Sequence, residues 1–440
     1  MYDPVTHKNI PLSHEKLISS YWSAIQPDYK HQLYAFPRQC DILIIGAGYT
    51  GLNAALTLAS EYNQSVTVLD AGSIGAGCSS RNAGFVLPGT GRLSFQDYQS
   101  KFGVDTARAV QDEFALSVNR VKALCESAPA SVQLNEARYL KLAHRKHLSQ
   151  KLEAQVSQYS DTLLNANWID PKTLQQQLPG VNNMHGGISF TPAMSLNPKA
   201  YVNHLARLCD KANVHMHSQI AMSHYEQRRH DIAVHTNKGI VHAKKLLLCT
   251  NGYLPKGASP ELRSKHLPVL SSVLVTEPLN PSEVEAIGLS TSDLVMDTRK
   301  LKYYYRLLPD NRLLFGGRGA ISGKNAAHPK YASHLLKALK HSLPALKGIK
   351  AEYHWHGWIS VSLDSMPRVF SPTPGVYTAM GYCGAGIAFS NLAGKRLAQL
   401  SMDEPLPELP FYQSALPTFP APAMRRLGQW LYYQYGQLVD

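Results

Sequence analysis

Three glycines and one aspartate carry the clearest chemical signal in the sequence. Gly46, Gly48 and Gly51 follow the spacing G-x-G-x-x-G, and Asp70 lies nineteen residues beyond the last glycine. Such a glycine turn lets the backbone approach a pyrophosphate, and a carboxylate at that separation accepts hydrogen bonds from ribose hydroxyls. The spacing therefore predicts a dinucleotide site, and the acid at Asp70 argues against the 2′-phosphate of NADP.

The segments around these glycines are typical of the elements that such a site needs. Residues 42–45 form a continuous apolar run, as in a parallel strand buried on both faces, and residues 66–69 indicate a second strand. Between them we expect a helix from Thr50 to about Glu61, whose first N–H groups and dipole would face the phosphates. Together these segments predict a Rossmann-type unit.

A glycine- and serine-rich segment after Asp70 favours FAD over NAD. It reads AGSIGAGCSSRNAGF and occupies residues 71–85. Its small residues would let the backbone run beside an extended cofactor, while Arg81 would balance phosphate charge or lie near the flavin ring. The alternative interpretation is an ordinary surface loop.

These segments resemble the D-amino-acid-oxidase and glycine-oxidase superfamily of FAD-dependent oxidoreductases. GCSSRNAGF, and SYWSAIQPDYK ahead of the first strand, most resemble its gamma-glutamylputrescine oxidase branch, and the likeness continues through KKLLLCTNGYL and GVYTAMGYCGAGIAFSNLAGKRLAQL. The resemblance implies FAD as cofactor and an oxidoreductase acting on CH–NH or CH–NH2 donors. It also implies an α/β fold (α+β overall). In that fold a Rossmann-type, glutathione-reductase-like FAD-binding domain carries an inserted antiparallel-sheet-plus-helix substrate domain.

The resemblance further implies which residues bind FAD. The turn at residues 381–387 would face the flavin ring, where a helix N-terminus stabilises negative charge on reduced flavin. The complete predicted set is Gly46, Ala47, Gly48, Tyr49, Thr50, Gly51, Asp70, Ala71, Gly77, Cys78, Ser79, Ser80, Arg81, Asn82, Ala83, Gly84, Ile220, Thr250, Asn251, Gly252, Gly357, Trp358, Gly384, Ala385, Gly386 and Ile387.

We expect the FAD-binding domain to be discontinuous. Apolar residues recur at steps of three and four in residues 104–124, so the first insertion is expected to be helical. The second insertion reads as strands, with a hairpin turning at residues 309–311. The predicted parts are 1–91, 195–264 and 351–410 for the FAD-binding domain, 92–194 and 265–350 for the substrate domain, and 411–440 for a C-terminal extension with a helix.

The stretch HWHGWISVSLDSMPRVF lacks a cation that related enzymes use to bind their substrates, and this absence indicates a different class of substrate. In glycine- and D-amino-acid-oxidising relatives, an arginine shortly after W-x-G holds the α-carboxylate. The resemblance puts Ile359 at that position, and Gly384 and Gly386 lie where glycine oxidases carry another arginine. A buried carboxylate without its cation costs about 3–5 kcal/mol. An amine with no carboxylate beside the reacting carbon therefore fits best.

These points predict a gamma-glutamylputrescine oxidase-like amine oxidoreductase, in which hydride transfer to flavin N5 gives an imine that is hydrolysed to an aldehyde. One alternative is an oxidase or dehydrogenase of the same fold that acts on a cyclic imino acid or D-amino acid. Another is a non-catalytic flavoprotein. No catalytic base is indicated. The candidates for the substrate pocket are His356, Trp358, Tyr303, Tyr305, Arg299, Arg306 and Arg318.

The electron acceptor is left open by the sequence. The sarcosine-oxidase side of the superfamily uses a lysine over the flavin to activate oxygen, but the matching strand here has no lysine between Asn311 and Arg318. Oxygen and another acceptor such as a quinone both remain. No family pattern marks Cys383 as a point of covalent flavin attachment.

Composition argues against several other classes of protein. The net charge of +13 is dispersed, without Lys/Arg runs, so we expect no nucleic-acid partner. The six cysteines form no CxxC pair, and the histidine pairs at 215/217 and 354/356 lack a third ligand, so we expect no metal. Because no signal core and no apolar run of about eighteen residues occur, we expect a cytoplasmic protein without a membrane span. The oligomeric state stays open.

Overall fold

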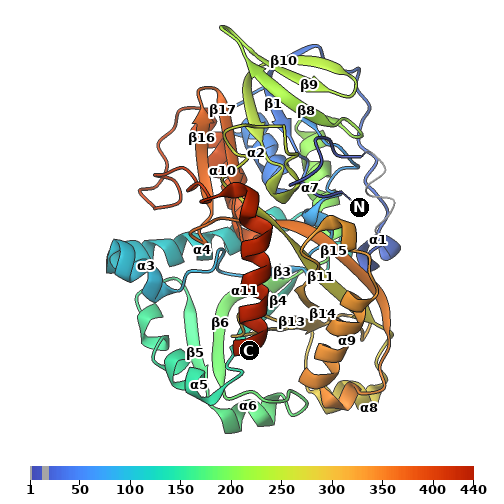
Figure 1. Ribbon diagram of the computed structural model, residues 1–440, viewed down its shortest axis with the longest axis vertical. Coiled ribbons are helices and arrows are strands. Elements are labelled where there is room, and N and C mark those ends of the chain that lie inside the picture. The colour runs from blue at the N-terminus through green and yellow to red at the C-terminus, as the bar shows by residue number, and fades with distance from the viewer. Residues whose placement is uncertain (1, 12–18) are drawn as a thin grey trace.

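The computed structural model describes residues 2–11 and 19–440, and it contains two sheets, one above the other in Figure 1. The first sheet has eight strands. Six of them follow the order β16 (Arg368–Thr373), β17 (Val376–Met380), β10 (Gly239–Leu248), β1 (Gln39–Ile45), β2 (Val66–Leu69) and β7 (His215–His217). The other two, β8 (Met222–Gln227) and β9 (Ile232–Thr236), extend β10 as an antiparallel ribbon.

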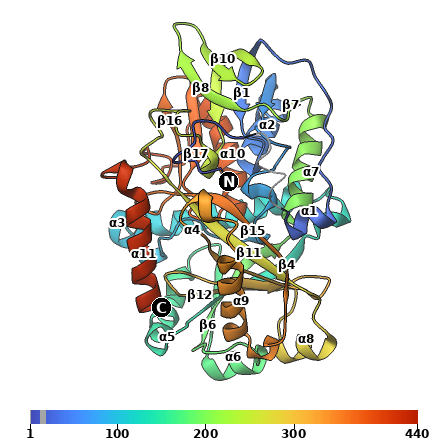
Figure 2. The same ribbon diagram turned by 45° about the vertical axis from the view of Figure 1, so that its right-hand side comes forward.

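Apolar strands and three helices form the Rossmann-type unit. β1 pairs in parallel with β2 and β10, and β10 pairs in parallel with β17. α2 (Tyr49–Ser60) starts directly after the first glycine turn and packs against α7 (Pro198–Lys211) and α10 (Ile387–Ser401). Both α2 and α10 lie against this sheet in Figure 2. The predicted fold class is confirmed.

The second sheet has nine strands, and most of them come from the two insertions. Their order is β15 (Ala351–Val361), β11 (Leu267–Thr276), β14 (Leu313–Arg318), β13 (Tyr304–Leu307), β12 (Asp293–Asp297), β4 (Asn135–Leu142), β6 (Gly187–Ser195) and β3 (Phe85–Val86), with β5 (Asn165–Ile169) paired to β6. Because β15 pairs along β11, we propose that the third FAD-binding segment starts after β15 rather than at residue 351.

The first insertion is only partly helical, so that expectation was incomplete. It contains β4, β5 and most of β6 beside four helices, which are α3 (Phe95–Phe102), α4 (Val104–Leu124), α5 (Lys146–Glu153) and α6 (Pro171–Gln177). β4 has a register shift between Ala137 and Tyr139, which breaks the alternation that a strand would show in sequence. The second insertion contains the predicted strands and hairpin, with α8 (Pro281–Ile287) and α9 (Lys330–Ser342) added.

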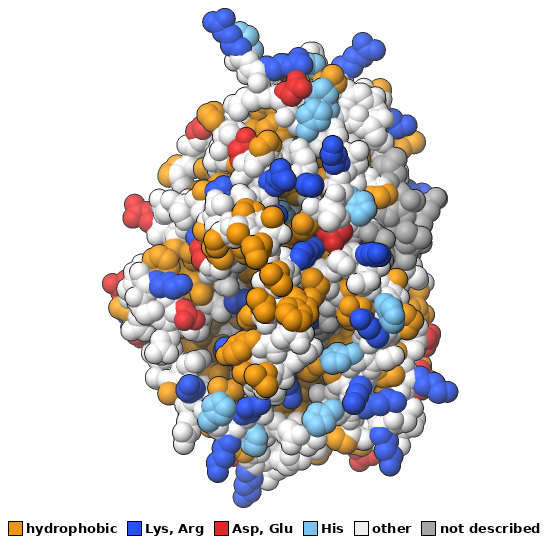
Figure 3. Space-filling view, viewed as in Figure 1, with side chains coloured by type: hydrophobic (Ala, Val, Ile, Leu, Met, Phe, Trp, Pro, Cys, Tyr) orange, Lys and Arg blue, Asp and Glu red, His pale blue; other side chains and the backbone are white. Residues whose placement is uncertain are grey.

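Helices at both ends of the chain dock on this body. α1 (Tyr21–Ile25) contacts α7. In α11 (Arg425–Val439), Arg426 donates hydrogen bonds to the carbonyl of Pro268 at 2.7 Å and to Asp3 Oδ1 at 2.8 Å. The outer face of α11 carries an exposed apolar patch (Figure 3), which includes Leu427, Trp430, Leu431, Tyr435 and Leu438. Within residues 2–11 and 19–440, no helix has the length and apolar character to cross a membrane.

Candidate active site

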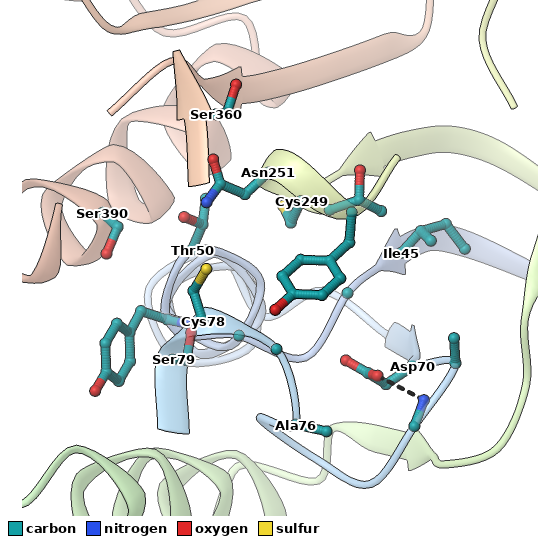
Figure 4. Close-up of a pocket in the computed structure, with 18 of the residues that line it drawn as sticks. Ile45, Thr50, Asp70, Ala76, Cys78, Ser79, Cys249, Asn251, Ser360 and Ser390 are labelled. Carbon is teal, nitrogen blue, oxygen red and sulfur yellow. Dashed lines mark hydrogen bonds between the residues drawn. The ribbon is translucent and has the colours of Figure 1, made fainter. Parts of the chain in front are cut away.

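Turns that follow three parallel strands meet around one space, which we call the turn cavity. They are the turn after β1, residues 250–251 after β10, and residues 384–387 between β17 and α10. The loop after β2 closes another side (Figure 4). Together with its open mouth the space measures about 1320 Å³, and it extends from the loop after β2 to the turn before α10. It suits an extended dinucleotide.

The turns meet because β1, β10 and β17 are neighbouring parallel strands. Ile45 of β1 pairs with Leu248 of β10, and Leu248 pairs with Thr378 of β17. The carboxyl ends of the three strands therefore open at the same edge of the sheet, which is where α/β folds bind ligands. Strand pairing thus brings together two glycine turns from opposite ends of the sequence.

Asp70 follows β2 and lies at the wall of the turn cavity (Figure 4). Its Oδ2 accepts a hydrogen bond from the Ala47 N–H at 2.7 Å, and its Oδ1 accepts one from the Gly72 N–H at 2.9 Å. These bonds fix the carboxylate between the first glycine turn and the following loop. Asp70 therefore lies beside the first glycine turn, and its contact with a ribose stays a prediction.

Polar groups at the walls are buried without a partner in the described part of the chain. They are Asn251 Oδ1 and Ser360 Oγ, and Arg81 Nη1 is unpaired in the same way in the adjoining cavity. Each unpaired group of this kind costs about 1–3 kcal/mol. In addition, α2 and α10 begin at Gly48 and Gly386 without a side-chain cap. Free helix N–H groups and unpaired polar atoms fit a ligand with phosphates, hydroxyls and a polar ring system, which FAD has.

Most of the predicted FAD-binding residues lie at this space. Those that line it are Gly46, Gly48, Tyr49, Thr50, Asp70, Ala71, Gly77, Cys78, Ser79, Asn82, Ile220, Thr250, Asn251, Gly384, Gly386 and Ile387. Arg81, Ala83, Gly357 and Ala385 line the adjoining cavity described below. The others, which line neither, are Ala47, Gly51, Ser80, Gly84, Gly252 and Trp358.

The turn cavity also contains residues that are absent from the predicted FAD-binding set. Tyr382 lines it and places its Oη 2.9 Å from Thr50 Oγ1, and Tyr253 lines it from the segment after β10. Both tyrosines adjoin a predicted turn, so their positions beside apolar strands were a usable signal. Ile10 and Pro11 line it as well. Nothing in their local sequence indicates that the N-terminal segment returns to this site.

A second space, the sheet cavity, lies between the turn at residues 384–387 and one face of the second sheet. It measures about 630 Å³, and because Cys78, Asn82 and Ile359 line both cavities, the two adjoin. Its remaining walls are mainly apolar. They include Phe85, Leu87, Val273 and Met296, with hydroxyls from Ser271 and Tyr304.

Tyr304, rather than Tyr303 or Tyr305, lines the sheet cavity. Successive side chains of a strand point to opposite faces. The Tyr305 ring stacks on Phe315 at 5.5 Å, within the apolar cluster that α9 covers on the other face. Tyr304 Oη lies 3.0 Å from Ser271 Oγ. The structure thus selects the one tyrosine of this run that the sequence analysis did not name.

The same alternation turns His356 and Trp358 away from the sheet cavity. Gly357 and Ile359 of β15 line it, so the side chains at 356 and 358 point to the opposite face. The Trp358 indole donates a hydrogen bond to the carbonyl of Tyr2 at 3.2 Å. His356 and Trp358, two of the predicted pocket residues, therefore do not line the sheet cavity.

The three arginine candidates differ in their surroundings. Arg299 forms an ion pair with Asp297, and Arg306 donates to a backbone carbonyl at 2.8 Å, so both are held by the protein itself. Arg318 has no hydrogen-bond or ion-pair partner among the described residues. A Cβ on Gly384 would lie 3.8 Å from its Nη1. Arg318 is therefore the candidate that lies beside the turn expected to face the flavin.

The thiols at the turn cavity and at the turn before α10 are not thiolates. Burial raises the pKa of Cys249, which lines the turn cavity. Burial raises the pKa of Cys78 to about 12 and also raises the pKa of Cys383. Cys78 Sγ donates to the carbonyl of Trp358, and Cys383 Sγ donates to the carbonyl of Gly381 at 3.2 Å. Neither thiol has the environment of a reactive nucleophile.

The histidine pairs noted in the sequence lie in ordinary strand surroundings. His215 stacks on Tyr34 at 4.0 Å, and His354 Nε2 lies 2.7 Å from Ser272 Oγ. One group of possible metal ligands is found among the described residues, on the outer ribbon of β8 and β9. It consists of His224, Glu226 and His235, whose ligand atoms lie within 4.8 Å of one another.

Replacing Arg81 with alanine is expected to weaken FAD binding. Its Nη1 is buried and unpaired, and its side chain lines the sheet cavity. A charged hydrogen bond contributes about 1.5–3 kcal/mol, so the dissociation constant should rise about 10- to 100-fold. Flavin fluorescence titration of the apoprotein measures it. Arg108→Ala, which removes an exposed ion pair with Asp161, is the control. If Arg81→Ala and the wild type bind FAD with equal affinity, Arg81 does not contribute to FAD binding.

Comparison with protein families and curated proteins gives consistent matches. A family model described as "FAD dependent oxidoreductase" matches residues 41–400. The chain is 30% identical to the gamma-glutamylputrescine oxidoreductase of Escherichia coli over 374 residues, which cover 82% of this chain and 83% of that protein. It is 27% identical to the probable oxidoreductase OrdL of Haemophilus influenzae, with 84% and 86% covered.

Solved structures share the fold. Glycine oxidase from Geobacillus kaustophilus superposes with a TM-score of 0.68 at 18% identity, covering 86% of this chain and 99% of that one. L-proline dehydrogenase from P. horikoshii superposes with a TM-score of 0.69 at 19% identity, covering 86% and 96%. At these identities the likeness concerns the arrangement of the sheets and helices.

Proposed function

The chain belongs to the family of FAD-dependent oxidoreductases, and we propose that it oxidises an amine whose reacting carbon carries no carboxylate. The proposed substrate class is an amine of the gamma-glutamylputrescine kind, with its carboxylate remote from that carbon. Similarity to the E. coli gamma-glutamylputrescine oxidoreductase over four-fifths of the chain supports this class.

The observation that carries the proposal is the apolar side chain at position 359. Ile359 lines both cavities, and its Cδ1 would lie 3.0 Å from a Cβ on Gly384. An α-carboxylate held next to the flavin-facing turn would therefore meet an isoleucine where amino-acid-oxidising relatives have an arginine. A carboxylate buried against Ile359 has no cation at that position, which disfavours an α-amino acid held as in those relatives. Arg318, which also lies beside Gly384, leaves room for a carboxylate held elsewhere.

The walls of the sheet cavity would prepare the amine for reaction. When bound, FAD accepts a hydride from the carbon that bears the amine, which leaves an imine for water to hydrolyse to an aldehyde. Phe85, Leu87, Val273 and Met296 desolvate the amine and so lower its pKa, which favours the neutral, reactive form. Tyr304 and Ser271 offer hydroxyls that can orient it.

The proposal also covers the electron acceptor of the enzyme and its cellular compartment. A small acceptor, either oxygen or another oxidant, takes the electrons from the reduced enzyme. All six cysteines are free, which supports a reducing, cytoplasmic compartment.

Anaerobic titration of the FAD-loaded protein tests the proposal. We expect N-γ-glutamylputrescine to bleach the visible absorbance of oxidised flavin, and glycine, D-alanine and proline to leave it unchanged at equal concentration. Bleaching by amino acids alone would overturn the proposal in favour of an amino-acid or imino-acid oxidoreductase. If no amine bleaches the bound flavin, the non-catalytic alternative replaces it.

A further inference from the structure

Four cations gather beyond the residues that line the sheet cavity, close to α11. Strand register places two of them on the cavity face. Arg318 pairs with Ser271, and Lys141 pairs with Met296, and both partners line the cavity. Residues paired across neighbouring strands point to the same face. Lys302 precedes Tyr304 of β13 by two positions, within electrostatic reach of both cations.

The fourth cation, Arg92, closes this group on the outer side. It donates hydrogen bonds to Tyr432 Oη of α11 at 3.0 Å and to the carbonyl of Lys300 at 3.3 Å. These neutral acceptors position its guanidinium but leave its charge unbalanced. Electrostatic interactions with Arg92 affect both Lys302 and Arg318. The four side chains, which we call the cation cluster, are Arg92, Lys141, Lys302 and Arg318.

The cation cluster has no acid paired with it at short range. Asp97 interacts with Lys141 through its charge, but its carboxylate accepts hydrogen bonds from Ser94 at the start of α3. None of its four members forms an ion pair in the described part of the chain, although each is partly buried. Asp297, the acid whose charge raises the pKa of Lys302, is already engaged by the Arg299 side chain and by the N–H groups of Arg299 and Tyr303 at 3.1 Å. Gathering like charges without a counter-charge is costly unless a ligand supplies one.

The gathering of the four cations affects the pKa of Lys302. Burial, followed by repulsion from Lys141, Arg92 and Arg318, lowers the pKa of Lys302 to about 7. Burial also lowers the pKa of Lys141, and burial with repulsion from Arg92 lowers that of Arg318. A buried lysine whose protonated form is disfavoured in the free protein becomes protonated more readily when an anion binds beside it.

We propose that the cation cluster is an anion subsite that holds a carboxylate of the substrate, remote from the carbon that is oxidised. The subsite deepens the proposed function and rests on it for the identity of the ligand. Arg318 connects it to the reaction centre, since its Nη1 would lie 3.8 Å from a Cβ on Gly384. We do not expect the FAD phosphates to bind at the cation cluster, because the N-terminus of α2, which is the expected phosphate site, lies at the turn cavity.

Glutarate binding to the oxidised holoenzyme tests the subsite without any turnover. We expect glutarate to perturb the flavin spectrum. Lys302→Met and Arg318→Met should each raise its dissociation constant about tenfold or more, because each removes a charge-assisted hydrogen bond. Lys300→Met is the matched control, since its side chain is exposed and lies outside the cluster. Wild-type and cluster variants that bind glutarate equally would overturn the subsite.

A matched pair of amines separates the subsite from the reaction. Of two linear amines of equal length, the one ending in a carboxylate should have a KM about tenfold or more below the one ending in a methyl group. The cluster variants should abolish this difference in KM while kcat stays comparable. If no amine reduces the flavin but glutarate still binds through the cluster, the proposed function fails and the subsite stands. If the amines react alike in every variant, the subsite fails and the function stands.

The pH dependence and the stability of the Lys302→Met variant give an independent check on folding. Glutarate should bind more tightly as the pH falls through about 7, because Lys302 then gains its proton beside Lys141, Arg92 and Arg318. The variant should lose that pH dependence and unfold at the same or a higher temperature than wild type. A lower unfolding temperature, with the pH dependence retained, would contradict the assignment.

Discussion

An alanine at Gly51 is expected to abolish retention of FAD. Its Cβ would lie 1.9 Å from the carbonyl oxygen of Gly46, so α2 would have to move away from β1 or the turn would have to change shape. Overpacking usually costs about 1–3 kcal/mol, and because this overlap is with a backbone atom we expect a cost at or above the upper end, which lowers the FAD affinity about 100-fold or more. The effect is large because the displaced turn and helix N-terminus are the predicted pyrophosphate site.

The matched control for this variant is Gly257→Ala. A Cβ on Gly257 would meet no atom within 4 Å, so the same chemical change should leave FAD binding and folding unaffected. The ratio of visible to ultraviolet absorbance after gel filtration in the absence of free FAD compares the two variants directly. Full flavin occupancy of Gly51→Ala would show that the close contact between α2 and the turn is not required.

An alanine at Glu113 is expected to lower the free energy of unfolding by about 3–5 kcal/mol. Glu113 is 4% exposed, and its carboxylate accepts hydrogen bonds from Arg396 at 2.9 and 3.1 Å and from Tyr412 Oη at 2.8 Å. This group ties α4 of the first insertion to α10 of the FAD-binding domain. Removing the carboxylate leaves a largely buried guanidinium without its counter-charge.

Glu61→Ala provides the comparison for Glu113→Ala. It removes an ion pair with Lys395, the neighbour of Arg396 on α10, at 2.8 Å. Both partners are partly exposed, and such pairs are worth about 0–1 kcal/mol. Urea unfolding curves give the two free energies. If both variants lose the same free energy of unfolding, the buried Glu113 group contributes no more stability than the exposed ion pair.

The sequence was most informative where geometry forces a particular residue type. The spacing of Gly46, Gly48 and Gly51 predicted the first turn, and Asp70 was found at the end of β2 as expected. Asn197 followed by Pro198 is a typical helix start, and the Asn197 side chain accepts hydrogen bonds from the first free N–H groups of α7. Each signal is local, since a turn, a strand end or a helix cap is fixed by a few neighbouring residues.

The sequence was least informative about which face of a strand meets the cavity. Tyr303, Tyr304 and Tyr305 are chemically alike, so no periodicity distinguishes the residue that lines the sheet cavity from its neighbours. The missing cation at Ile359 was visible in sequence, but the cation cluster was not. Its members come from the segment before α3, from β4, from the turn before β13 and from β14, and only the pairing of β12 with β4 brings Lys141 to the others.

The flavin content of the purified protein tests the central claim most directly, namely that two glycine turns from opposite ends of the sequence meet around one FAD. Heat release of the cofactor and its quantification against protein concentration give the stoichiometry. The account predicts a yellow protein with one FAD per chain, or a colourless apoprotein that reaches that value when FAD is added. A folded protein that stays colourless in excess FAD would contradict it.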